Sequence, residues 1–123
     1  LFGQPAKAAW TPAEIVQATV RLGGVAGALI ATHDGLVVAR QLPPSLNGEA
    51  MSGLLPEIFN RINQYTKDLK LGETNSITVR VGNQPLEIIR AGKVYFAVLG
   101  RAGENLPADK LRSIGTELEQ QHK

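Results

Sequence analysis

The spacing of hydrophobic residues along the chain changes several times, and each change marks an expected element of secondary structure. Apolar stripes at helical spacing alternate with short apolar runs that are typical of strands. Three helices are expected, at Pro12–Leu22, Gly48–Lys70 and Pro107–Gln121. Five strands are expected, at Val25–Thr32, Leu36–Gln41, Ser76–Val81, Pro85–Ala91 and Val94–Gly100. Short turns between consecutive strands predict antiparallel pairing, and therefore an α+β fold.

Short polar signals separate these elements. Thr11-Pro12-Ala13-Glu14 has the composition of a helix start, in which threonine caps the helix and Glu14 reaches back to it. His33-Asp34-Gly35 is expected to form a tight turn between the first two strands, because Asp-Gly is a strong hairpin signal. Pro56 lies inside the long helix, where it removes a hydrogen-bond donor and is expected to kink the preceding turn.

The strands differ in how apolar their two faces are. Val25–Thr32 and Val94–Gly100 are apolar on both faces, which predicts a place at the centre of the sheet with helices above and below. Ser76–Val81 is half polar, which suits an edge. That strand contains no proline or lysine, and its one charged residue is Arg80, so it lacks the usual protection of an edge. We therefore expect it to be open to pairing with another chain.

The long helix is more apolar than a helix that covers one side of a sheet needs to be. At about 100° per residue, its hydrophobic side chains occupy roughly half of the helical wheel. The surplus edge, formed by Met51, Leu55 and Phe59, is either covered by the Pro43–Asn47 loop or packed on a second chain. Together with the open strand, we favour a twofold dimer that pairs each edge strand with its own copy. The expected dimer interface is Met51, Leu55, Phe59, Ile77, Thr78, Val79 and Arg80.

Composition sets outer limits on the class of protein. The 123 residues suit one domain, expected at residues 11–121 after a leader or linker at residues 1–10, where Trp10 is expected to anchor against the fold. Because the chain opens at Leu1, either a longer parent protein or a lost first segment is expected.

The net charge is +2 and no dense basic run occurs, so binding to a nucleic-acid backbone is not indicated. No apolar stretch approaches the length of a membrane span, and the absence of cysteine fits a cytoplasmic location.

No catalytic constellation is visible. The chain has neither a P-loop nor a G-x-G-x-x-G segment, and cysteine-based metal or redox sites are excluded. Of the two histidines, His33 is expected to be a solvated turn residue and His122 lies near the chain end. Tyr95 and Phe96 are expected in the core, and a weak basic set (Arg80, Arg90, Lys93, Arg101) is expected to line the sheet rim. We therefore expect no enzyme activity, no cofactor and no bound metal.

One stretch resembles a known family. Val25-Ala26-Gly27-Ala28-Leu29-Ile30-Ala31-Thr32-His33-Asp34-Gly35-Leu36-Val37-Val38-Ala39 is similar to the first hairpin of the roadblock-type dynein light chain domain family. The resemblance extends to about Leu118 and includes a three-strand meander that ends in Val94-Tyr95-Phe96-Ala97-Val98-Leu99. It implies a five-stranded antiparallel sheet between a long helix on one face and the N- and C-terminal helices on the other, in the order α-β-β-α-β-β-β-α. Pro56 departs from the usual uninterrupted long helix of the family.

The resemblance also implies a function. Family members dimerise through the third strand, here Asn75–Val81, and the long helix; they are not enzymes, and they act as scaffolds. Bacterial members resemble regulators of small Ras-like GTPases, such as the partner of a gliding-motility GTPase. The expected partner-binding residues lie on the polar side of the long helix, at Glu57, Asn60, Arg61, Gln64 and Lys67. Alternatives are a structural scaffold subunit without GTPase regulation and a small-molecule sensor, which would need a cavity between sheet and helix.

Overall fold

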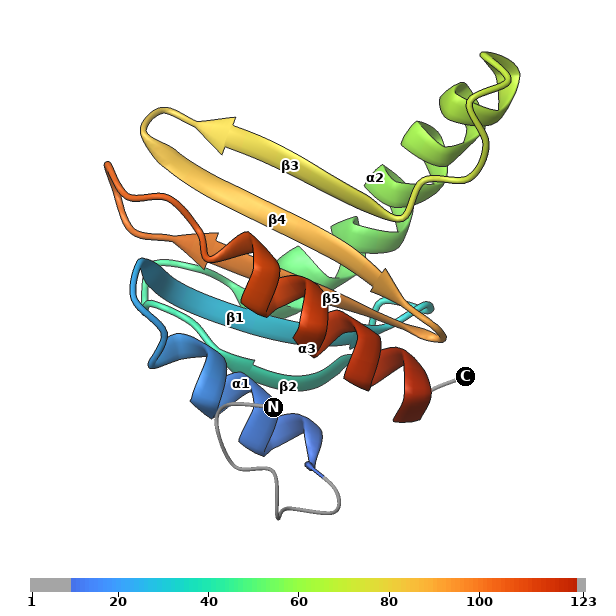
Figure 1. Ribbon diagram of the computed structural model, residues 1–123. Helices are drawn as coiled ribbons and strands as arrows, with labels where there is room; N and C mark the ends of the chain where they lie inside the picture. Colours follow the sequence, from blue (N-terminus) through green and yellow to red (C-terminus); the bar gives the residue numbers. More distant parts are fainter. Residues whose placement is uncertain (1–9, 122–123) are drawn as a thin grey trace.

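The computed structural model describes residues 10–121, so His122 and all but the last residue of the leader expected at residues 1–10 lie outside the described residues. Three helices and five strands follow one another in the predicted order (Figure 1). Their bounds are α1 Pro12–Val20, β1 Val25–Thr32, β2 Val37–Gln41, α2 Gly48–Asp68, β3 Ser76–Val81, β4 Gln84–Ala91, β5 Val94–Gly100 and α3 Ala108–Gln121.

The strands form one antiparallel sheet with the order β2-β1-β5-β4-β3. β5 lies at the centre between β1 and β4, and every residue of β5 except Leu99 is buried. The prediction that β1 and β5 are inner strands is therefore confirmed. β3 lies at one edge of the sheet and β2 at the other, so the prediction for Ser76–Val81 is also confirmed.

The helices cover the two faces of the sheet unequally. α1 packs on β1 and β2 while α3 packs on β4 and β5, both on the same face, and α2 crosses the opposite face over β1 and β2 (Figure 1). The face under α1 and α3 holds the larger core, which includes Trp10, Ile15, Phe96, Ile114 and Leu118. The core under α2 consists of Leu29, Ala31, Leu55, Phe59, Ile88, Tyr95 and Ala97. The expected three-layer arrangement is confirmed.

Local sequence signals act as predicted at the start of the domain. The Thr11 Oγ1 accepts a hydrogen bond from the Glu14 N–H at 3.2 Å, and the Glu14 Oε1 accepts one from the Thr11 N–H at 3.0 Å. These two bonds complete a capping box for α1. Trp10 is buried in the adjacent core, as expected for an anchor.

The β1–β2 turn is built around Gly35, which has a φ of +88°. A Cβ there would lie 3.2 Å from the Ser52 carbonyl oxygen, so glycine serves both the turn and the close approach of α2. The Ser52 hydroxyl in turn donates a 2.8 Å hydrogen bond to the Gly35 carbonyl oxygen. The hairpin and the first turns of α2 are therefore fastened together.

α2 continues through Pro56 as one helix of 21 residues and ends two residues before the predicted end. Its first half lies against the sheet, whereas its second half extends beyond the β3 side of the sheet (Figure 1). Phe59 is the buried residue nearest to the C-terminal end of α2. The second half of α2 therefore has little of its own core to pack against. No helix within residues 10–121 is long and apolar enough to cross a membrane.

Candidate interaction surface

The free edge of β3 is the first part of the candidate surface. β3 pairs with β4 over six residues, from Ser76 opposite Ile89 to Val81 opposite Gln84, without a register shift. Its other side meets no strand in the described part of the chain. Every residue of β3 except Ile77 is exposed. A regular edge with unpaired N–H and C=O groups is a template for another strand.

The opposite edge of the sheet is better protected. β2 has five residues, and its pairing with β1 shifts register between Ile30 and Ala31. Its Arg40 side chain is held by Glu49 of α2, with 2.8 Å between Nη1 and Oε2. Bulges, short strands and charges are devices that discourage edge pairing. The two edges of this sheet therefore differ, and β3 is the one suited to a partner.

The second part of the surface is a row of exposed apolar side chains on α2 and on its C-cap residue, Leu69. We call Leu54, Ile58, Tyr65 and Leu69 the α2 apolar stripe; they are between 38% and 69% exposed. At about 100° per residue, these four positions fall within roughly 60° of the helical wheel. The surplus of apolar residues predicted for the long helix is thus real, and it is exposed in the single chain.

The sequence analysis assigned Leu55 and Phe59 to this exposed surplus, and that prediction was wrong. Leu55 and Phe59 are 2% and 1% exposed, and both pack in the chain's own core under α2. Met51 is half-buried against the same core. The apolar arc is wide enough to serve two surfaces, and the sheet takes the part that contains Leu55 and Phe59. The neighbouring part, which contains Leu54 and Ile58, is left outside.

The β3 side chains continue the surface on the α2 side of the sheet. Register with β4 places Ile77, Val79 and Val81 on that side, because they lie opposite Ile88, Leu86 and Gln84. Ile77 is half-buried against the core, whereas Val79 and Val81 are exposed. Thr78 and Arg80 point to the opposite side, where the Thr78 hydroxyl donates to Glu87 Oε2 at 2.9 Å. The apolar residues expected at the edge therefore share one face.

A polar row runs along α2 beside the apolar stripe. We call Glu57, Asn60, Arg61, Gln64 and Lys67 the α2 polar stripe, and all five are exposed. Glu57 and Arg61 form an ion pair at 3.3 Å, while Gln64 donates to Asp68 and Lys67 pairs with Glu73. The sequence analysis did not identify Asp68 and Glu73 as the partners of Gln64 and Lys67. Exposed pairs of this kind contribute about 0.2–1 kcal/mol each, so a partner could displace them at small cost.

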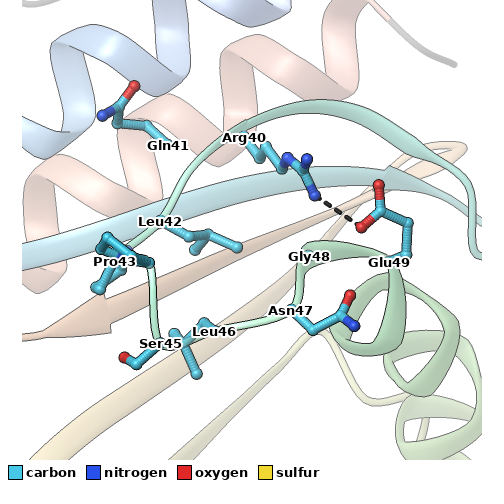
Figure 2. Close-up of a pocket in the computed structure, with 10 residues that line it drawn as sticks. Arg40, Gln41, Leu42, Pro43, Ser45, Leu46, Asn47, Gly48 and Glu49 are labelled. Carbon is cyan, nitrogen blue, oxygen red and sulfur yellow. Dashed lines mark hydrogen bonds and ion pairs between the residues drawn. The ribbon is translucent and has the colours of Figure 1, made fainter.

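An open cavity of about 610 Å³ lies beside the start of α2, lined by residues 40–49 (Figure 2). Arg40 reaches across to Glu49 at its rim, and a Cβ on Gly48 would lie 2.5 Å from Arg40 Nη1. Backbone hydrogen bonding and then Arg40 lower the pKa of the Glu49 carboxyl. The cavity is formed by the loop between β2 and α2 and by the residues that flank this loop. The small-molecule alternative would instead require a cavity enclosed between the sheet and a helix.

The remaining candidate residues lie apart from this surface. His33 is exposed in its turn, with its Nε2 3.1 Å from Asp34 Oδ1. Tyr95 and Phe96 are buried, as predicted. No group of three or more histidine, aspartate or glutamate residues within residues 10–121 is placed to hold a metal ion.

An open edge strand and an exposed apolar helix face are together typical of a small α+β protein-interaction domain. The chain belongs to the Roadblock/LC7 domain family, whose model matches residues 12–100. An uncharacterised protein of Methanocaldococcus jannaschii, MJ0310, is 24% identical over 100 residues, which cover 74% of this chain and 88% of that protein.

Solved structures share the fold at low sequence identity. MglB of Myxococcus xanthus superposes with a TM-score of 0.79 at 11% identity, covering 89% of this chain and 92% of that chain. The gliding protein MglB of Thermus thermophilus superposes with a TM-score of 0.73 at 17% identity, covering 87% and 84%. At these identities the likeness shows the fold alone.

Proposed function

We propose that this protein is a non-enzymatic homodimeric interaction module that binds and regulates a small Ras-like GTPase in the cytoplasm. The observation that carries the proposal is the open β3 edge, together with the unpartnered apolar residues of α2, whose second half extends past the β3 side of the sheet (Figure 1). The family membership and the two MglB neighbours, one of them named a gliding protein, support the GTPase-regulating branch that the sequence resembles.

The dimer follows from what a single chain leaves uncovered. Antiparallel pairing of β3 with β3 of a second copy would satisfy the free backbone groups and join two five-stranded sheets. A twofold axis at that seam places both α2 helices on the same side, so their apolar stripes can cover one another. The proposed interface keeps Ile77, Thr78, Val79, Arg80 and Met51 from the sequence prediction, and it replaces Leu55 and Phe59 by the α2 apolar stripe.

The GTPase would bind to the α2 polar stripe, which remains exposed when the apolar stripe is buried. Arg61 is the first choice among its residues, because arginine is enriched in interfaces and this side chain is held only by an exposed ion pair. We assign it to contact and not to catalysis. The module would act by ordering the catalytic loops of the GTPase itself.

Two measurements test the proposal in sequence. Light scattering during size-exclusion chromatography should give twice the chain mass of 13.2 kDa, and a monomer at high concentration would contradict the dimer. Immobilised protein should then retain purified small Ras-like GTPases in a way that depends on the bound nucleotide. Retention of filament or motor components alone, without nucleotide dependence, would instead favour the structural scaffold.

A further inference from the structure

The corner between α2 and β3 contains a closed network of polar side chains. The Thr74 N–H donates to Asn63 Oδ1 at 2.7 Å, and the hydroxyls of Thr66 and Thr74 lie 2.8 Å apart. The Thr66 hydroxyl also donates to the Asn63 carbonyl oxygen at 3.0 Å. We call Asn63, Thr66 and Thr74 the corner clamp.

The two threonine hydroxyls of the corner clamp are paired with each other. Each has one proton, and either oxygen can be the donor of the bond between them. The Thr66 hydroxyl also has the Asn63 carbonyl oxygen within reach. Thr74 is one of three buried polar residues in the described chain, beside Thr19 and Ser52. All of its polar groups that face α2 are thus paired, and a lost partner would leave a buried group unsatisfied.

The corner clamp lies where α2 has little other support. Beyond Phe59 no residue of α2 is fully buried, and the helix extends past the sheet (Figure 1). The chain then reverses through two residues with positive φ, Lys70 at +63° and Gly72 at +104°. Thr74 returns the chain to the helix two residues before β3 begins at Ser76.

The clamp therefore joins the two halves of the proposed interface. Thr66 lies between two residues of the α2 apolar stripe, directly after Tyr65 and three residues before Leu69. Thr74 holds the start of the edge strand. We infer that Asn63, Thr66 and Thr74 are positioning residues for dimerisation, which set the placement of the α2 stripe relative to β3 before a second copy binds. This inference rests on the proposed homodimer.

The test compares variants of the whole chain. Asn63→Ala removes the acceptor of the Thr74 N–H, Thr74→Val removes one hydroxyl with little change of shape, and Asn63→Asp retains an acceptor. Gln120→Ala, at an exposed amide side chain of α3, is the matched control. Dimer dissociation constants are measured by analytical ultracentrifugation, and backbone hydrogen exchange is followed by mass spectrometry.

Asn63→Ala should raise the dissociation constant about tenfold and Thr74→Val should raise it by a smaller factor, since each loses part of a buried network. Asn63→Asp and Gln120→Ala should stay within about twofold of the wild type. Exchange should increase at the end of α2 and at the start of β3, while β1 and β5 stay protected.

Three results would overturn the inference. If the wild type is dimeric and Asn63→Ala and Thr74→Val dimerise equally well, the clamp does not position the interface, although the dimer stands. If exchange in β1 and β5 rises as much as at the corner, the clamp supports the whole fold and not the interface. A monomeric wild type would overturn the proposed dimer itself, and this inference with it.

Discussion

The rings of Phe59 and Tyr95 pack against each other with their centroids 5.2 Å apart and their planes tilted by 45°. Phe59 comes from α2 and Tyr95 from the central strand β5, so this contact fixes which side of the helix faces the sheet. Tilted aromatic pairs of this kind add to the free energy gained by burial. The contact explains why Phe59 belongs to the folding core and not to the surface.

Phe59→Ala should therefore destabilise the single chain. We expect the free energy of unfolding to fall by about 3–5 kcal/mol, the usual cost of emptying a buried phenylalanine site. Urea unfolding followed by circular dichroism measures this change. A variant that unfolds like the wild type but no longer dimerises would return Phe59 to the interface and contradict the packing described above.

Leu69→Asp should separate the dimer and leave the fold intact. The charge replaces an exposed apolar side chain that a second copy would bury, where it would have no partner. Leu36→Asp, at a leucine that is 66% exposed in the β1–β2 turn, is the matched control and should remain dimeric. Equal dimerisation of both variants, measured by light scattering, would remove the α2 apolar stripe from the interface.

Val79→Lys tests which edge of the sheet is used. We expect this variant to be monomeric, because a lysine on an edge strand discourages pairing. The substitution should not change the melting temperature of the folded single chain. Val38 on the opposite edge is 41% exposed, against 39% for Val79, and Val38→Lys should leave the dimer unaffected. The reverse outcome in sedimentation experiments would place the seam at β2.

Arg61→Glu should weaken retention of the GTPase without affecting dimerisation. The substitution reverses the charge at the middle of the α2 polar stripe and also breaks the pair with Glu57. Arg112→Glu on α3 is the control, since Arg112 is similarly exposed and pairs with Asp109 three residues before it. Identical binding curves for the two variants would remove the polar stripe from the proposed contact.

Acid should weaken the attachment of α2 to β2. The pKa of Glu49 is lowered from its ordinary value of 4.5, first by backbone hydrogen bonding and then by Arg40. A lowered pKa in the folded state gives a stabilisation that is present above pH 4.5 and is lost as the pH falls through the folded-state value. Melting temperatures measured from pH 6 downwards should fall less steeply for Glu49→Gln; parallel curves for both proteins would show that the pair contributes nothing.

The sequence by itself determined the order of the elements, the antiparallel sheet and the assignment of β3 to an edge. These follow from local properties: the Asp34-Gly35 turn, the capping box of α1 and the apolar faces of β1 and β5. The presence of a surplus apolar arc on α2 could also be read from helical spacing alone.

Only the tertiary structure decided which residues of that arc are exposed. A helical wheel ranks positions around the axis but carries no information on the rotation of the helix against its sheet. That rotation is set where side chains of both elements interlock, here where Phe59 packs on Tyr95 and the Ser52 hydroxyl reaches the Gly35 carbonyl oxygen. The corner clamp likewise depends on the chain reversing between Thr66 and Thr74, a path set by positive φ at Lys70 and Gly72. Periodicity along the sequence does not encode either arrangement.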